Sequence, residues 1–172
     1  LRPWMPWSQN EPIAPSERLD YLRDCRSKFD ADEDYTYGIF QTDESEVVGA
    51  TGLHTGRGDG TREIGYWIRE EQTNRGFATE AARALTHVGL RIVGVDRIEI
   101  RCAPDNDASA AIPEKLGFEQ EGTLRNAGVD VSNDPRDTQI WSMTPDRLPD
   151  SLAADPDVTA YDILGHRLTP SA

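Results

Sequence analysis

A glycine-containing turn that leads into a helix is the feature that most constrains this chain. Residues 63–84 read E-I-G-Y-W-I-R-E-E-Q-T-N-R-G-F-A-T-E-A-A-R-A, which predicts a strand, a tight turn and a helix in that order. The first N–H groups of a helix have no partner inside the helix, and the helix dipole adds partial positive charge there. Gly76 has no Cβ, so the backbone can approach a bound group closely. The pattern therefore predicts a phosphate-binding turn.

Hydrophobic periodicity over the rest of the chain predicts one α/β domain and a tail. Helices are expected at 16–29, 76–93 and 107–116, and strands at 35–41, 47–54, 63–69, 97–103, 118–125 and 138–144. The polar segments 55–61 and 126–137 are expected to be loops. We expect the domain to span 1–144. Residues 145–157 are expected to form a linker, and 158–168 either a short docking helix or a disordered tail.

Charge argues against a nucleic-acid-binding surface, because the formal net charge is -13. Lysine occurs only at Lys28 and Lys115, so the basic residues are mostly arginines. Such an acidic, lysine-poor surface is expected of a protein kept soluble in high salt. The alternative is an acidic rim that attracts a cationic amine.

A cytoplasmic protein is expected, because no apolar run of about 18 residues predicts a membrane span and no leader pattern opens the chain. The chain begins with Leu, so N-terminal residues can have been lost. Cys25 and Cys102 lie far apart without metal-binding spacing, which favours reduced thiols that serve packing.

Three sequence blocks, I-G-Y, R-G-F-A-T-E-A and N-D-A-S-A-A-I-P-E-K-L-G-F, resemble the GNAT acetyltransferase superfamily. More narrowly, they resemble the RimJ/RimL-type protein N-terminal acetyltransferases. The resemblance covers roughly residues 1–144. It implies an α/β (α+β) fold with a mixed, mostly antiparallel, twisted sheet that is flanked by helices and splayed at its central strands. Family members usually begin with a further strand and helix, and Thr73 stands where Gln or Arg is common.

The resemblance implies that acetyl-CoA is the co-substrate and that no metal is needed. The turn would hold the pyrophosphate chiefly through backbone N–H groups of Thr73, Asn74, Arg75, Gly76, Phe77, Ala78 and Thr79. Arg75 would add charge there, and its alternative role is that of a solvated surface residue. The main chain of Tyr66, Trp67 and Ile68 would pair with pantetheine and polarise the thioester.

The family places two polar residues of the next helix beside the thioester. Asn106 would bind the pantetheine arm or the acceptor backbone, and Ser109 would protonate the leaving thiolate. Both residues are also good helix-capping types, which is the alternative reading. Many superfamily members carry a tyrosine acid where this chain has Pro113. Thiolate can leave with little help, because a free thiol has a pKa near 8.5.

A carboxylate at the start of a strand is the main candidate for the base. Glu63 occupies the place that the family's proposed base has, and the alternative is an ordinary strand-end carboxylate. His54 is a second candidate base, with a structural histidine as its alternative. An α-amine has a pKa near 8, so a modest base or water is sufficient.

The acceptor stays open between three functions. The first is acetylation of a protein N-terminal α-amine, of the ribosomal-protein type. The second is acetylation of a small amine such as an aminoglycoside or polyamine, and the third is a non-catalytic CoA-binding module. Trp4, Met5 and Trp7 either line an acceptor groove or serve packing. We expect a monomer or a homodimer that binds neither nucleic acid nor membrane.

Overall fold

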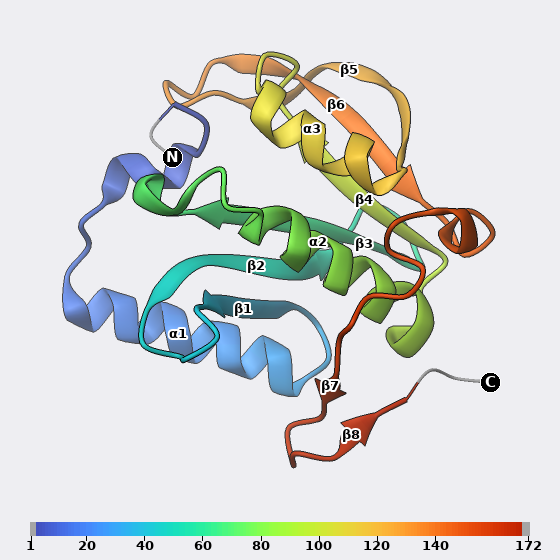
Figure 1. Ribbon diagram of the computed structural model, residues 1–172. Helices are drawn as coiled ribbons and strands as arrows, with labels where there is room; N and C mark the ends of the chain where they lie inside the picture. The colour runs from blue at the N-terminus through green and yellow to red at the C-terminus, as the bar shows by residue number, and fades with distance from the viewer. Residues whose placement is uncertain (1–2, 170–172) are drawn as a thin grey trace.

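The computed structural model describes residues 3–169 and shows a six-stranded sheet with helices packed on it (Figure 1). The strand order is β1-β2-β3-β4-β6-β5, and only β3 and β4 are parallel. The strands are β1 Tyr35–Phe40, β2 Val47–Thr55, β3 Thr61–Ile68, β4 Arg97–Cys102, β5 Glu119–Val129 and β6 Pro135–Met143. The α-helices are α1 Pro15–Asp30, α2 Phe77–His87 and α3 Asp107–Leu116. The expected mixed, mostly antiparallel architecture is confirmed.

Helix α2 covers one face of the central strands and forms the core with them. Leu53 of β2 pairs with Ile64 of β3, and both side chains are buried together with Ala82 and Leu85 of α2. Burying an aliphatic side chain of this size contributes about 1.5–3 kcal/mol. The predicted helix 76–93 is split, since α2 is followed by a π-helix at Val88–Val93. None of the helices described between residues 3 and 169 is long and apolar enough to cross a membrane.

Strands β3 and β4 separate soon after they begin. Their parallel pairing joins Thr61 to Arg97, Arg62 to Ile98 and Glu63 to Glu99. In the described chain β3 then continues to Ile68 along β2 alone. The two central strands therefore form an open wedge from Glu63 onward, as the expected splay requires.

Helix α1 lies on the side of the sheet opposite α2, and it leaves room there. Side chains alternate between the two faces of a strand, so the neighbours of the core residues point toward α1. Several of these positions carry small side chains: Gly38 pairs with Ala50, and Gly52 pairs with Gly65. None of the side chains of α1 is buried. The small side chains of the sheet, here called the floor, and the distance of α1 from them leave a cavity between helix and sheet.

The β5–β6 hairpin is longer than the sequence predicted, so the prediction of a loop over 126–137 is wrong. The strands continue to Val129 and resume at Pro135. Asp130 explains the tight connection, because its carboxylate accepts the N–H groups of Ser132 and Asp134. Asn133 adopts a positive φ of 65°, which asparagine tolerates better than most residues.

The segment after β6 packs back on the domain. Leu148 and Ala153 are fully buried, and the Arg83 guanidinium of α2 donates to the carbonyls of Leu152 and Asp155 at 2.6 and 3.0 Å. Residues 145–157 are thus attached to the sheet-and-helix body, and a domain boundary after residue 144 stays a prediction. A short 3-10 helix, η4 Leu148–Asp150, lies within this segment.

The docking helix considered for residues 158–168 does not form. This segment is a small hairpin of β7 Ala160–Tyr161 and β8 Arg167–Leu168 (Figure 1). Asp162 accepts the backbone N–H groups of Leu164 and His166, and Gly165 takes a positive φ of 82°. These turn-forming residues interrupt the helical spacing.

Candidate active site

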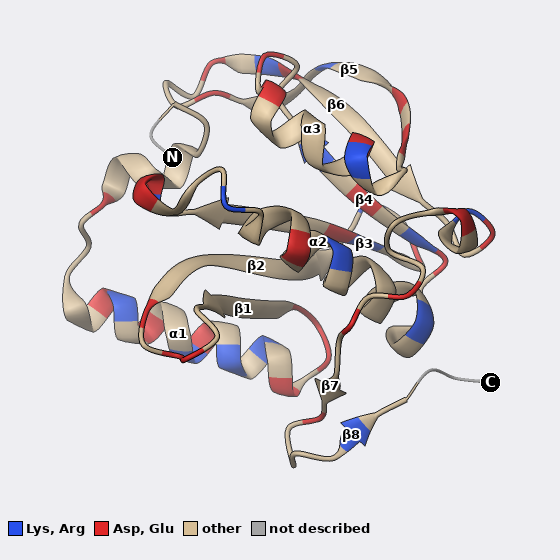
Figure 2. Cartoon of the chain, viewed as in Figure 1, with Lys and Arg blue, Asp and Glu red and all other residues tan. Residues whose placement is uncertain are grey.

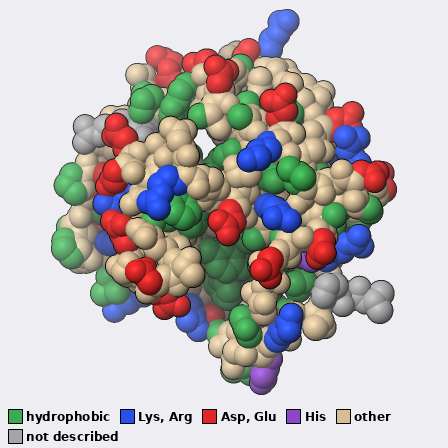
Figure 3. Space-filling view, viewed as in Figure 1, with side chains coloured by type: hydrophobic (Ala, Val, Ile, Leu, Met, Phe, Trp, Pro, Cys, Tyr) green, Lys and Arg blue, Asp and Glu red, His purple; other side chains and the backbone are tan. Residues whose placement is uncertain are grey.

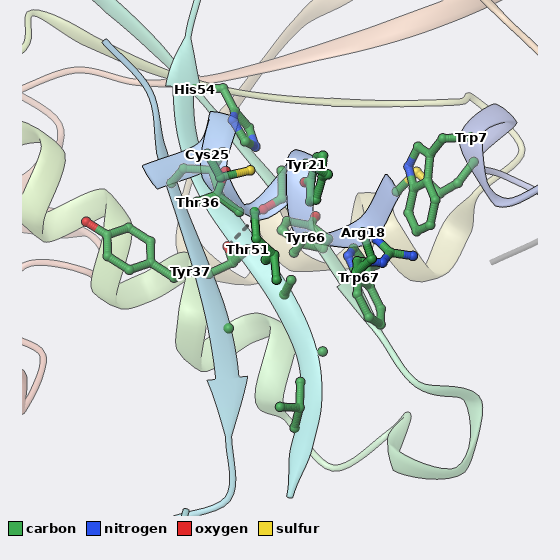
Figure 4. A pocket seen from close by; sticks show the side chains of 18 of the residues that line it. Trp7, Arg18, Tyr21, Cys25, Thr36, Tyr37, Thr51, His54, Tyr66 and Trp67 are labelled. Carbon is green, nitrogen blue, oxygen red and sulfur yellow. Dashed lines mark hydrogen bonds between the residues drawn. The ribbon is translucent and has the colours of Figure 1, made fainter. Parts of the chain in front are cut away.

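A cavity of about 1430 Å³ lies between α1 and the first three strands and reaches the wedge. Figure 4 shows Tyr21 and Cys25 of α1 among side chains of β2 and β3 that line it. Glu63, Tyr66 and Trp67 of β3 reach it, as does Ser109 of α3. The cavity therefore brings together the predicted base, the predicted thioester strand and the predicted thiolate acid.

Glu63 belongs to a charged row across β3 and β4. Burial raises the pKa of Glu63 above its ordinary value, the positive charge of Arg101 opposes that rise, and Glu99 adds to it. Arg101 lies 3.4 Å from Glu63 but is held mainly by Glu99, to which it donates at 2.9 and 2.7 Å. The Glu63 carboxylate thus keeps the capacity to accept a proton.

His54 lies beside Glu63, because the two residues are direct partners across β2 and β3. Its Nδ1 is 2.8 Å from a carboxylate oxygen of Asp34, which fixes the ring orientation. The ring passes over the backbone of Gly52 and Gly65, where an added Cβ would meet it at 2.3 and 3.3 Å. The small residues of the floor thus make room for the imidazole.

Tyr66 and Ser109 meet across the wedge. The Tyr66 hydroxyl donates to the Ser109 carbonyl at 3.1 Å and lies 3.3 Å from the Ser109 hydroxyl. Burial raises the pKa of Tyr66 to about 12, so the phenol stays protonated. Asn106 has its side-chain oxygen on the backbone N–H of Ser109 and caps α3. The structure therefore shows the capping alternative for Asn106, and its contact with a ligand stays a prediction.

The predicted phosphate turn lies at the start of α2, outside the residues that line the cavity. Gly76 takes a φ of 89° and has no side-chain cap. The first intrahelical bond runs from the Glu80 N–H to the Gly76 carbonyl, so the N–H groups of Phe77, Ala78 and Thr79 precede it. These groups point along the helix axis into the space before it.

Two residues of the turn are already engaged. The Thr73 N–H and hydroxyl both donate to the Glu70 carbonyl, at 3.2 and 2.8 Å. Thr73 is therefore held in the turn by its own backbone, and its N–H has a partner other than phosphate. Arg75 donates to the side chain of Gln72 and lies 5.1 Å from the Phe77 ring centroid. Asn74 reverses the chain with a positive φ of 60°.

The strand, wedge and turn match one family of known proteins. Residues 1–119 match the acetyltransferase (GNAT) domain family. This chain belongs to the GNAT acetyltransferase family. The family resemblance that the sequence motifs indicated is therefore confirmed.

Individual relatives place this GNAT acetyltransferase among bacterial N-acetyltransferases. It is 34% identical to the uncharacterized N-acetyltransferase YoaA of Bacillus subtilis over 112 residues, which is 64% of this chain and 63% of that protein. It is 27% identical over 155 residues to the [ribosomal protein uS5]-alanine N-acetyltransferase of Escherichia coli, covering 87% of this chain and 78% of that one. The chain thus spans less than two thirds of YoaA and more of the second relative.

A solved relative supports the fold at greater length. The structure of Mycobacterium smegmatis RimJ in complex with CoA-disulfide superposes with a TM-score of 0.78 at 26% identity. The match covers 90% of this GNAT acetyltransferase and 75% of RimJ.

Sequence reasoning missed three partners in the site of this GNAT acetyltransferase. The alternating R-I-E-I-R pattern of β4 predicts which face of the sheet carries Arg101. It does not predict that Arg101 lies beside Glu63. Asp34 ends an acidic loop, and only the fold brings it to His54. The hydroxyl of Tyr66 was overlooked because the family's tyrosine acid is expected on α3, where this chain has Pro113, and not on β3.

Some of the remaining candidate residues line the cavity, and others serve to pack the core. Met5 and Trp7 line the cavity, and the Trp7 ring lies 6.0 Å from that of Trp67. The two cysteines are free thiols, and Cys25 also lines the cavity whereas Cys102, at the end of β4, is buried. The expected packing role fits Cys102, because its side chain is buried and that burial raises the pKa of the thiol.

Proposed function

We propose that the protein transfers acetyl from acetyl-CoA to a primary amine, and that this amine is the N-terminal α-amine of a protein. The observation that carries the proposal is the wedge between β3 and β4, which begins at Glu63. Residues on both sides of the wedge, Glu63 of β3 and Arg101 of β4, line the cavity under α1. A thioester lying in the wedge would meet an amine from the cavity.

The turn before α2 is suited to the diphosphate. The N–H groups of Phe77, Ala78 and Thr79 precede the first helical bond, and the helix dipole favours an anion there. Arg75 would supply charge after a small movement from Gln72. The pantetheine arm would then run along β3, where the main-chain groups of Tyr66 and Ile68 face the opening and those of Trp67 face β2.

The amine must lose a proton before it attacks. Glu63 accepts that proton, directly or through a water, and His54 is the alternative acceptor because it lies beside Glu63 with its ring held by Asp34. The neutral amine attacks the acetyl carbonyl, and the main-chain N–H of Ile68, which points away from β2 whereas that of Trp67 points toward it, stabilises the oxyanion. The nitrogen of the intermediate then releases a second proton to solvent, and collapse forms the amide and releases the thiolate.

The leaving thiolate takes its proton from the other side of the wedge. Ser109 lies there with its hydroxyl 3.3 Å from that of Tyr66. Tyr66 orients Ser109, the Ser109 hydroxyl gives its proton to sulfur, and the second proton lost by the nitrogen restores that hydroxyl through solvent. This arrangement would replace the tyrosine acid of other superfamily members, whose position here is Pro113.

The relatives favour a protein acceptor. The uS5-alanine N-acetyltransferase of Escherichia coli, which the chain covers over 78% of its length, is named for an alanine of a ribosomal protein. We carry that acceptor type, a protein N-terminus, to this chain as part of the proposal.

Two measurements test the proposal. Acetyl-CoA at about 100 times its dissociation constant should raise the free energy of unfolding by about 2.7 kcal/mol, because it binds only the folded state. Mass spectrometry should then detect acetylated peptides when N-terminal peptides, a polyamine and an aminoglycoside are offered together. Stabilisation without any acetylated product would favour the non-catalytic CoA-binding module. A product only from the small amines would overturn the protein acceptor.

A further inference from the structure

We propose that the acceptor is a peptide whose first residue carries a large apolar side chain, and that the cavity rejects polycationic amines. The inference rests on the proposed function and adds the class of acceptor to it. It comes from the walls, the floor and the charges of the cavity under α1.

The middle of α1 forms an apolar wall over an open space. Arg18 at its N-terminal end pairs with Glu11, and Phe29 at its C-terminal end packs edge-on against Tyr35 at 5.3 Å. The side chain of Leu22 lies between these attachments and lines the cavity, although it is 54% exposed. The helix is therefore fixed at both ends while its central apolar side chains stay available.

The sheet side of the cavity has small side chains in its middle and aromatic rings at one end. Ala50 lies between Gly38 of β1 and Trp67 of β3, and all three line the cavity. Glycine and alanine leave depth for a side chain that enters from the solvent, and the Trp67 and Trp7 rings lie 6.0 Å apart beside it. A large apolar side chain would fill this depth and remove its surface from water.

The charges of the cavity are unlike those of the whole chain. Three arginines line it, and each has a carboxylate partner: Arg18 pairs with Glu11, Arg26 with Asp30 and Arg101 with Glu99. Of the two carboxylates that line the cavity, Glu11 is thus engaged, and Glu63 has a 3.4 Å contact with Arg101. The chain as a whole has 31 acidic and 18 basic side chains. Figure 3 shows Asp and Glu spread over the outer surface, and Figure 2 shows both signs along α1. The acidic excess therefore lies outside the cavity.

This balance favours one cation and disfavours several. An amine beside Glu63 has a carboxylate partner, but further ammonium groups of a polyamine or aminoglycoside would find Glu11, the other carboxylate that lines the cavity, already paired with Arg18. A peptide carries a single ammonium group at its end and then carbonyl oxygens, which are acceptors for guanidinium donors. The volume of about 1430 Å³ also exceeds the roughly 300–1000 Å³ of ordinary small-ligand sites.

The first experiment measures binding without turnover. Peptides that differ only in their first residue, Leu, Phe, Ala or Ser, are titrated into the protein with CoA present, alongside spermidine. Quenching or enhancement of tryptophan fluorescence reports occupancy, since Trp7 and Trp67 line the cavity. We expect Leu- and Phe-first peptides to bind at least about tenfold more tightly than Ala- or Ser-first peptides. Equal binding of all peptides, or tighter binding of spermidine, would overturn the inference.

The second experiment uses a matched pair on α1. Leu22→Ser removes an apolar wall residue, and Leu19→Ser changes a similarly exposed leucine that does not line the cavity. We expect Leu22→Ser to weaken the Leu-first peptide about tenfold and the Ser-first peptide little. Leu19→Ser should leave both unchanged. Equal effects of the two substitutions would contradict the apolar wall.

The two proposals fail in different ways. If Leu-first peptides bind selectively but no peptide is acetylated, the cavity's selectivity stands and the proposed reaction falls. If Ser- or Ala-first peptides are acetylated best, the reaction stands and the apolar acceptor is refuted. Acetylation with selectivity for Leu- or Phe-first peptides supports both.

Discussion

Glu63 and Glu99 are the last parallel partners of β3 and β4 before the two strands separate. Their carboxylates differ in environment, because Glu99 is paired with both Arg97 and Arg101 whereas Glu63 has only a 3.4 Å contact with Arg101. One carboxylate therefore neutralises the arginines, and the other remains able to take a proton at the apex of the wedge. The predictions below begin from that difference.

Glu63→Gln should lower kcat about a hundredfold or more while leaving acetyl-CoA affinity within about threefold, because a general base acts on the chemical step. Steady-state kinetics and calorimetry measure the two quantities. The pKa of Glu63 is raised by burial, so the wild-type rate should fall as pH drops through that raised value and the Gln variant should lack this limb. An identical pH profile for both proteins would exclude Glu63 as the base.

The same shift predicts the stability of that variant. A carboxyl whose pKa is raised on folding contributes stability below its unfolded pKa and loses it as pH rises through the folded pKa. At pH 8 the Glu63→Gln protein should therefore melt at or above the wild-type temperature. A marked loss of melting temperature at pH 8 would show that the carboxylate is structural instead.

Gly76→Ala should weaken acetyl-CoA, whereas Gly94→Ala should not. Both glycines have positive φ, 89° and 77°, and at neither would an added Cβ meet an atom within 4 Å. Each substitution should cost about 1 kcal/mol of stability through backbone strain alone. Only Gly76 precedes α2, so only its substitution should reduce the stabilisation that acetyl-CoA confers. Calorimetric titration separates the two effects, and equal affinities would contradict the turn's role.

Arg26→Glu should raise the affinity for spermidine several-fold, because it reverses one of the positive charges that line the cavity. Arg23→Glu is the control, since Arg23 lies on the same helix, pairs with Asp20 and does not line the cavity. Fluorescence titrations at low salt measure both variants, and the difference should shrink as salt increases. The same gain from both variants would mean that only the overall charge matters.

Glu121→Gln should destabilise the protein by about 1 kcal/mol at neutral pH, because its carboxylate accepts two bonds from Arg97 at 2.6 and 2.7 Å and one from Ser142. Those bonds lower the pKa of Glu121 to about 2. The stability is therefore present above the unfolded value of 4.5 and is lost as pH falls toward 2. Denaturant unfolding at pH 7 and pH 3 should show a smaller difference between variant and wild type at pH 3.

A neighbouring ion pair provides the control for that measurement. Glu119 accepts one bond from Arg147 at 2.8 Å, and the side chains are 57% and 43% exposed. Glu119→Gln should change stability less than Glu121→Gln, because single exposed pairs contribute little. A larger effect at Glu119 would contradict the argument from bidentate pairing.

The elements built from local patterns were predictable from the sequence. The turn at Gly76, helix α3 ending before Gly117 and the strand that carries Glu63 all follow from glycine conformation and hydrophobic period. The hairpin in the tail was not foreseen, because helical spacing in 158–168 concealed the turn formed by Asp162 and Gly165. Local elements can thus be predicted where the turn-forming residues and the hydrophobic period indicate the same structure.

What the sequence by itself determined is therefore the order of strand, turn and helix, and the family to which they belong. Only the tertiary structure decided that Arg101 would lie beside Glu63, that Asp34 would hold His54, and that α1 would stand over a floor of small residues. The physical reason is the distance along the chain over which each kind of interaction acts. Backbone preferences act over a few residues, whereas these contacts depend on the register between strands and on how far a helix stands from the sheet.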